Sequence, residues 1–287
     1  MTEGNGMEAF HTLRVRNEER NFALTDFELL TLAISALEWR KYNGSIKLVT
    51  DAAGAEYLYK HGLLDIWDKT EVMLDEMDSL DINEDMFWAG AKIYALSRQN
   101  APTVMLDLDF ILWEHINFSQ YGRDLAVIHR EDICEPVYPS KDYFKFQNGW
   151  QLPNWLDWST RPCNGALVYF GSQRFLREYT SFSLEFMRKT ADKDDRLRYM
   201  VFAEQRWMAM CAAHLDIPIH ELSTLEGLFS RSQKYFTHVW GYKQRLRDNP
   251  REAELFCLKC AGRLQHDFSE FAESIKSYTW AGKYMHD

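Results

Sequence analysis

The run of residues 102–113 constrains the fold most, because it is apolar and β-prone yet holds two aspartates in its C-terminal half. Taking a carboxylate out of water is costly unless the carboxylate is paired or bound to a metal. On a strand, residues i and i+2 point to the same side, which would place Asp107 and Asp109 together, about 6–7 Å apart. A divalent cation would remove their repulsion and use both carboxylates as oxygen ligands. The run therefore predicts a metal site at the end of a buried strand.

Composition and charge narrow the class of protein. The chain has 287 residues, 46% of them hydrophobic and 26% charged, which is typical of a soluble globular protein. A net charge of −10 argues against nucleic acid as a partner, because phosphate contacts need an excess of Lys and Arg. Five cysteines fit a reducing compartment, and no stretch has the pattern of a secretory signal or a membrane span. We therefore expect a cytoplasmic protein without a transmembrane segment, in which Cys257 and Cys260 are structural or incidental.

Local patterns predict alternating strands and helices. Thr25 and Glu28 have the spacing of a capping box, and apolar residues then recur at helical spacing up to about Tyr42. We expect strands within residues 7–13, 46–50, 65–74, 102–113, 125–129, 167–170 and 217–222, the last strand, and helices within 25–42, 52–61, 86–98, 173–190 and 199–213. Residues 75–85 should form a solvated connection, and residues 136–158 an irregular functional loop. The order predicts an α/β fold: a single Rossmann-like domain over residues 1–287, with a mostly parallel central sheet flanked by helices.

Further motifs follow the aspartate pair in the chain. They are Asn164-Gly165-Ala166 before a strand, Ala203-Glu204-Gln205 on a helix, and His238-Val239-Trp240-Gly241-Tyr242-Lys243. Together with Leu106-Asp107-Leu108-Asp109 they resemble the motifs of GT-A fold glycosyltransferases, which use nucleotide-sugar donors. The histidine segment is similar to the signature of the family-eight, glycogenin-like enzymes. It differs in that the lysine stands one residue closer to the glycine and Pro-Trp is absent, which leaves the stereochemistry of transfer open.

The resemblance implies a metal-dependent glycosyltransferase of the hexosyltransferase class that uses a UDP-sugar and a carbohydrate or glycoconjugate acceptor. It implies Mn²⁺ or Mg²⁺ as the cofactor, held by Asp107, Asp109 and His238. The residues expected to bind the nucleotide sugar are His11, Thr12, Asp51, Lys92, Asp107, Asn164, Gly165, Gly241 and Lys243. Glu204 and Gln205 are the expected catalytic residues. In these terms residues 7–115 form the nucleotide-binding half, residues 116–245 the acceptor and sugar half, and residues 246–287 a helical tail.

The chemistry of these residue types fits the implied reaction. Sugar transfer from a nucleoside diphosphate develops negative charge on the departing phosphate, which a divalent cation and Lys243 would stabilise. A glycine at 241 would let the backbone approach the phosphates closely. Two alternatives stay open: a phosphatase of the haloacid dehalogenase type, which also uses an Asp-x-Asp after a strand, and a catalytically silent sugar-binding protein of the same fold.

Overall fold

The computed structural model describes residues 6–16, 22–191, 194–228, 230 and 233–285. Two compact units divide the chain, and each is built from segments that are distant in sequence. The first comprises Met1–Met73, Asp107–Ile116 and Lys234–Asp287, and the second comprises Leu74–Leu106 and Asn117–Gln233. Each unit contains both strands and helices, which confirms the predicted α/β class. Within the described residues, no helix combines the length and apolarity needed to cross a membrane.

The first unit is organised around three parallel strands. They are β1 (Ala9–Leu13), β2 (Ile46–Thr50) and β3 (Lys69–Val72), in the order β3-β2-β1, with His11 opposite Leu48. Helices α1 (Asp26–Tyr42) and α2 (Ala52–Lys60) connect them, and a short 3₁₀ turn (Leu64–Ile66) precedes β3. The predicted capping box starts α1, where the Thr25 N–H donates to a Glu28 carboxylate oxygen at 3.0 Å. Local sequence signals therefore specify this β-α-β-α-β segment well.

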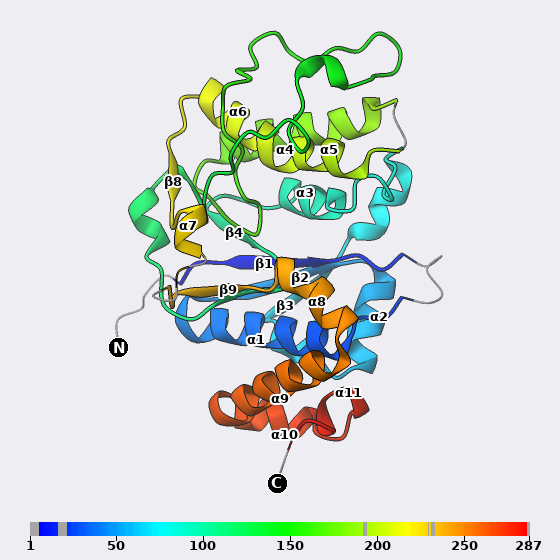
Figure 1. Cartoon of the computed structure of the whole chain (residues 1–287), viewed down its shortest axis with the longest axis vertical. Helices are drawn as coiled ribbons and strands as arrows, with labels where there is room; N and C mark the ends of the chain where they lie inside the picture. The colour runs from blue at the N-terminus through cyan, green and yellow to red at the C-terminus, as the bar shows by residue number, and fades with distance from the viewer. Residues whose placement is uncertain (1–5, 17–21, 192–193, 229, 231–232, 286–287) are drawn as a thin grey trace. The chain divides into compact units, whose positions relative to one another are not determined.

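The C-terminal part of the first unit adds a second, two-stranded sheet and further helices. Strand β5 (Phe110–Leu112) pairs antiparallel with β9 (Phe236–His238), so the strand predicted within residues 217–222 is not the last one. A 3₁₀ turn (Trp240–Tyr242) leads into α8 (Lys243–Asp248), α9 (Pro250–Asp267), α10 (Ser269–Ile275) and α11 (Thr279–Gly282). Figure 1 shows α1 between the strands and α9, against which it packs.

The second unit is a mixed sheet covered by helices. Its strands are β4 (Thr103–Leu106), β7 (Leu167–Phe170), β6 (Leu125–Val127) and β8 (Ile219–Glu221), in that spatial order. Strand β7 is antiparallel to β4 and β6, whereas β6 and β8 are parallel. The helices are α3 (Gly90–Ser97), α4 (Gln173–Lys189), α5 (Arg196–Val201), α6 (Trp207–His214) and α7 (Leu225–Leu228). Apart from the separate β5–β9 pair, three of the five strand pairs within the units are parallel, so the predicted sheet type is also confirmed.

Two segments differ from the expected structure. The run 102–113 is not one strand, because β4 ends at Leu106 and β5 begins at Phe110 in another sheet. Between them the Phe110 N–H donates to the Asp107 carbonyl at 3.0 Å, which closes a turn. The two aspartates are therefore brought together by a turn and not by the alternation of a strand. The acidic segment 75–85 likewise begins as a 3₁₀ turn (Leu74–Ser79) that buries Met77, so it is not simply a solvated connection.

The irregular segment 136–158 is held by aromatic packing. Apart from a 3₁₀ turn (Lys141–Tyr143) it has no regular structure. Phe144 is buried, and its ring centroid lies 4.4 Å from that of Phe202 and 5.7 Å from that of Phe186. Much of the aromatic content of the chain therefore fills the core of the second unit.

Candidate metal site and the polar cluster of the second unit

Three potential metal ligands converge in the first unit. Asp107, Asp109 and His238 each offer one ligand atom, and these atoms all lie within 4.8 Å of one another. The pairing of β5 with β9 explains the convergence, because Phe110, next to Asp109 in the chain, stands opposite His238. A main-chain bond from Val239 N–H to the Asp109 carbonyl, at 3.2 Å, continues the pairing beyond the strand.

A lysine supplies the positive charge at this cluster. Lys243 Nζ lies 2.9 Å from Asp109 Oδ2, and His238 Nε2 lies 3.8 Å from the same oxygen. Asp109 is only 8% exposed, so its charge needs a nearby counter-charge. Lys243 is the first residue of α8, which follows β9 after a single 3₁₀ turn. Because only this turn separates them, His238 and Lys243 are placed beside Asp109 by the same short segment.

The donor set fits a hard divalent cation. Two carboxylates and one imidazole are ligands that Mn²⁺ and Mg²⁺ accept, whereas thiolates, which favour Zn²⁺, are absent from the cluster. Ligand atoms on opposite sides of Mg²⁺ lie about 4.2 Å apart, twice the metal–oxygen distance. The three ligand atoms lie at most 4.8 Å apart, so small side-chain rotations would close the set around an ion.

The surroundings of the cluster are open on one side. A small pocket adjoins Asp109 and Lys243, and its other lining residues are Leu24, Phe27, Glu28, Thr31, Leu32, Leu108 and Val239. Trp240 is 71% exposed. A Cβ added at Gly241 would meet no atom of the described residues within 4 Å, so packing does not require glycine there. The position therefore leaves room for a ligand beside the charged groups.

The strand-end residues of the first unit have structural partners. His11 is fully buried; burial lowers the pKa of its imidazole to about 3, although the Asp109 charge opposes this. The Asp51 carboxylate accepts backbone N–H groups from Val15, Arg16 and Gly54, at 3.1, 2.7 and 2.9 Å, and so caps α2. Their expected contacts with a nucleotide stay a prediction, as does that of Thr12, whose buried hydroxyl has no hydrogen-bond partner among the described residues.

In the second unit, Glu204 forms an ion pair with Lys92. Glu204 Oε1 lies 2.5 Å from Lys92 Nζ, which also donates to the Gly165 carbonyl at 3.1 Å. Glu204 belongs to a π-helical segment (Phe202–Arg206) between α5 and α6, a local distortion that is frequent at functional sites. A Cβ at Gly165 would lie 2.8 Å from Glu204 Oε1, which explains the glycine. Lys92, Gly165 and Glu204, which were expected to serve different parts of one ligand, thus contact each other directly.

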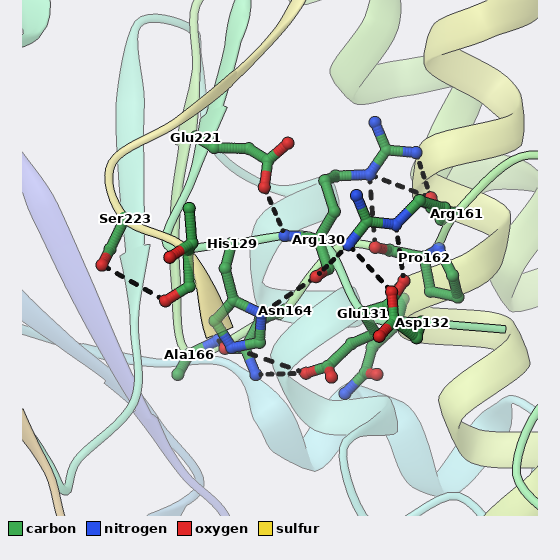
Figure 2. Close-up of polar contacts among 12 residues, drawn as sticks. His129, Arg130, Glu131, Asp132, Arg161, Pro162, Asn164, Ala166, Glu221 and Ser223 are labelled. Carbon is green, nitrogen blue, oxygen red and sulfur yellow. Dashed lines mark hydrogen bonds and ion pairs between the residues drawn. The ribbon is translucent and has the colours of Figure 1, made fainter. Parts of the chain in front are cut away.

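Further polar residues surround this pair. The Tyr138 hydroxyl donates to Gln205 Oε1 at 2.5 Å, and burial raises the pKa of the phenol, which therefore keeps its proton. Asn164 donates to Glu131 Oε1 at 3.1 Å and accepts the Ala166 N–H at 3.0 Å; Figure 2 shows these contacts. Neither Glu131 nor Tyr138 was predicted as a site residue, because both lie in irregular chain without motif spacing, although Tyr138 falls within the expected functional loop 136–158.

Arg130 and Arg161 form a charged rim beside the Asn164 contacts (Figure 2). Arg130 donates through Nε to the Arg161 carbonyl at 2.9 Å, and Arg161 donates back to the Arg130 carbonyl at 3.0 Å. The Glu221 carboxylate accepts the Arg130 N–H at 3.0 Å, which ties this rim to β8. His129 is buried beside it, with Nε2 3.6 Å from Glu131 Oε1 (Figure 2).

A family model matches residues 14–276 of the chain and is described as a family of unknown function, DUF6734. The chain belongs to the DUF6734 family. The match includes all the ligand candidates of the first unit except His11 and Thr12, and the whole polar cluster of the second. No curated protein matches the sequence of this DUF6734 chain.

Three solved structures similar to the DUF6734 chain are glycosyltransferases by their titles. Mouse xyloside xylosyltransferase 1 in its apo form has 11% identity and a TM-score of 0.41, over 76% of this chain and 85% of its own. The PaToxG glycosyltransferase has 9% identity and a TM-score of 0.43, over 94% and 86%. The glycosyltransferase GlyE of Streptococcus pneumoniae TIGR4 has 10% identity and a TM-score of 0.36, over 81% and 58%. Similarity at this level does not identify the activity of the DUF6734 chain.

Proposed function

We propose that this protein is a metal-dependent glycosyltransferase that transfers a sugar from a UDP-sugar to a carbohydrate or glycoconjugate acceptor. The observation that carries the proposal is the convergence of Asp107, Asp109 and His238, with Lys243 2.9 Å from Asp109. Two carboxylates, of which Asp109 is buried and Asp107 half-buried, with one imidazole and a partly exposed lysine suit a divalent cation together with a diphosphate. A hexose as the transferred sugar and a cytoplasmic location are parts of the same proposal.

Each residue of the metal cluster has a distinct task in this proposal. Asp107, Asp109 and His238 would hold Mn²⁺ or Mg²⁺, and the bound cation would neutralise charge that develops on the departing diphosphate. Lys243 would move its ammonium from Asp109 towards that diphosphate, because the cation takes over the carboxylate. The open position at Gly241 would admit the phosphate oxygens next to the main chain.

The polar cluster of the second unit is proposed to act on the sugar and the acceptor. Glu204 already has a counter-charge in Lys92, which suits electrostatic support of a developing positive centre on the sugar better than removal of a proton. Gln205 and Asn164 would contribute amide groups to sugar hydroxyls, and Gly165 would keep the approach to Glu204 clear. Lys92 would then act on the nucleotide sugar indirectly, by holding the Glu204 carboxylate in place.

The proposal is tested by calorimetric titration of the protein with UDP, with and without Mn²⁺. We expect affinity that requires the metal and that falls about 100-fold or more in Asp109→Asn, which keeps the shape of the side chain and removes a ligand charge. Asp65→Asn removes an exposed charge from the same unit and should leave binding unchanged. Equal Mn²⁺-dependent binding by Asp109→Asn would refute the ligand assignment. Failure of the wild type to bind with any divalent metal would favour the phosphatase or the silent protein.

A further inference from the structure

A buried chain of hydrogen bonds runs behind the metal cluster in the first unit. Trp67 Nε1 lies 3.1 Å from His11 Nδ1, and His11 Nε2 lies 3.1 Å from Ser35 Oγ. Ser35 Oγ in turn contacts the carbonyl oxygen of Phe110. All four residues are buried, and they come from four segments: the end of a 3₁₀ turn, β1, α1 and β5.

The chemistry of the groups fixes the direction of every bond in this chain. An indole N–H can only donate, so His11 Nδ1 accepts from Trp67. The Phe110 carbonyl can only accept, so the Ser35 hydroxyl donates to it. Ser35 Oγ therefore accepts a hydrogen bond from the N–H at His11 Nε2, and the imidazole is neutral. Each hydrogen-bonding proton therefore has a defined donor and acceptor, and the series of hydrogen bonds ends on the backbone oxygen of Phe110.

Phe110 is the residue on which the three metal ligands depend. It directly follows Asp109, its N–H donates to the Asp107 carbonyl, and it stands opposite His238 in the β5–β9 pair. Its ring also packs against that of His238, with centroids 5.6 Å apart. A displacement of Phe110 would therefore move all three ligands relative to one another.

The two-stranded sheet that contains Phe110 needs to be stabilised by contacts with other elements. Strands β5 and β9 have three residues each and form a sheet of their own, and a two-stranded sheet is marginally stable by itself. The Ser35 hydroxyl reaches this sheet from the middle of α1, a helix of 17 residues whose core-facing side is buried. The bond thus ties a strand of three residues to a long, buried helix.

We propose that Trp67, His11 and Ser35 are positioning residues for the metal site, which fix the Phe110 peptide and through it the geometry of Asp107, Asp109 and His238. The inference rests on the proposed metal site. It gives His11 a function that differs from the nucleotide contact expected from the sequence, since His11 acts through the protein backbone.

The test measures Mn²⁺ binding alone, by calorimetry and by the loss of the free-ion signal in electron paramagnetic resonance. Ser35→Ala removes the link to Phe110, and we expect the Mn²⁺ affinity to fall about tenfold, as for other changes to the supports of metal ligands. Ser35→Thr keeps the hydroxyl and should restore most of the affinity. A role confined to stability would not separate these two variants.

Ser183→Ala is the matched control. Ser183 is also a buried helical serine, and its hydroxyl donates to the carbonyl of Ala203, on a neighbouring element, at 2.8 Å, but it lies in the second unit. Its loss should lower thermal stability to an extent similar to Ser35→Ala and leave Mn²⁺ affinity unchanged. If Ser35→Ala does not fold, Trp67→Phe, which removes only the first donor of the chain, should still lower Mn²⁺ affinity about threefold, a smaller effect on the same scale.

The outcomes separate this inference from the proposed function. Wild-type protein that binds no Mn²⁺ would overturn the proposed metal site and the inference with it. Wild-type protein that binds Mn²⁺ while Ser35→Ala, or a folded Trp67→Phe, binds it equally well would overturn the inference alone.

Discussion

The metal cluster of the first unit and the polar cluster of the second both contain carboxylates with little exposure to solvent, but their charges are balanced in different ways. In the first, two carboxylates and an imidazole converge on one point, and Lys243, the lysine paired with Asp109, is 30% exposed. In the second, Glu204 is paired with Lys92 at 2.5 Å, and both side chains are nearly buried, at 7% and 12% exposure. Gln205 is likewise bonded to Tyr138.

The difference bears on the proposed binding of a cation. A cation that binds in the first cluster would neutralise the charge of two neighbouring carboxylates. It would displace only the partly exposed ammonium of Lys243. A ligand that approaches Glu204 meets a carboxylate whose charge is already balanced inside the protein. In the proposed function, the first cluster therefore binds a cation, and the second keeps its own bonds while a substrate approaches it.

The largest expected effect breaks this comparison at its buried ion pair. Lys92→Met should lower the free energy of unfolding by about 3–5 kcal/mol, because it leaves the buried Glu204 carboxylate without its counter-charge. The equivalent change in the first unit, Lys243→Met, should cost less, because that lysine is 30% exposed and the His238 imidazole also lies beside Asp109. Urea unfolding of the two variants measures the difference.

The double variant Lys92→Met/Glu204→Gln serves as the control for that measurement. It removes the orphaned charge and should recover much of the lost stability. Equal costs for Lys92→Met and Lys243→Met would mean that the two clusters do not differ in the way described.

A smaller effect, in pH dependence, sharpens the description of the first unit. The pKa of His11 is about 3 in the folded protein and about 6.5 in the unfolded chain, where the ring is solvated. Below pH 6.5 the unfolded chain binds a proton that the folded protein does not. His11 should therefore lower the free energy of unfolding by about 1.4 kcal/mol per pH unit between pH 6.5 and 3, and have no effect above 6.5.

Urea unfolding at pH 7.5 and pH 5 measures this slope. His11→Gln should be less stable than wild type at pH 7.5 and should lose the part of the acid sensitivity that comes from the imidazole. The same difference between the two pH values in both proteins would show that His11 is not the titrating group.

The smallest effect ranks the ligands within the metal cluster. His238→Ala should weaken Mn²⁺ binding about tenfold, less than Asp109→Asn, because a neutral nitrogen contributes less than a carboxylate to holding a dication. Glu131→Gln, in the polar cluster of the second unit, should leave Mn²⁺ affinity at the wild-type value. A loss in His238→Ala as large as in Asp109→Asn would reverse the ranking.

Local signals predicted much of the fold. The bounds expected for β2, β7 and α1 agree with the structure to within a residue, since a capping box or a bounded apolar run marks each of them. Strand β9 was missed, because three residues are too short for a period and its partner lies far away in sequence. The π-helical segment was missed as well, because Phe202–Arg206 continues the apolar pattern of an ordinary helix.

The candidate site was predictable in its residue types and less so in its geometry. Asp107, Asp109 and His238 were correctly grouped, but a turn and a second sheet bring them together. Polar residues at strand ends look alike in sequence whether they face solvent or the interior, which is why the buried partners of His11 and Asp51 were not foreseen.

The pairing of β5 with β9 has a consequence for how the protein is made. The bond from Trp113 Nε1 to Thr237 Oγ1 joins residues 124 positions apart, and the third metal ligand is carried on the later strand. Closing so long a loop costs entropy that only the finished sheet and its packing can offset. During synthesis Asp107 and Asp109 are made well before His238, the third ligand candidate. Competence to bind Mn²⁺ would therefore arise late in synthesis, once His238 has been made and β9 has paired with β5.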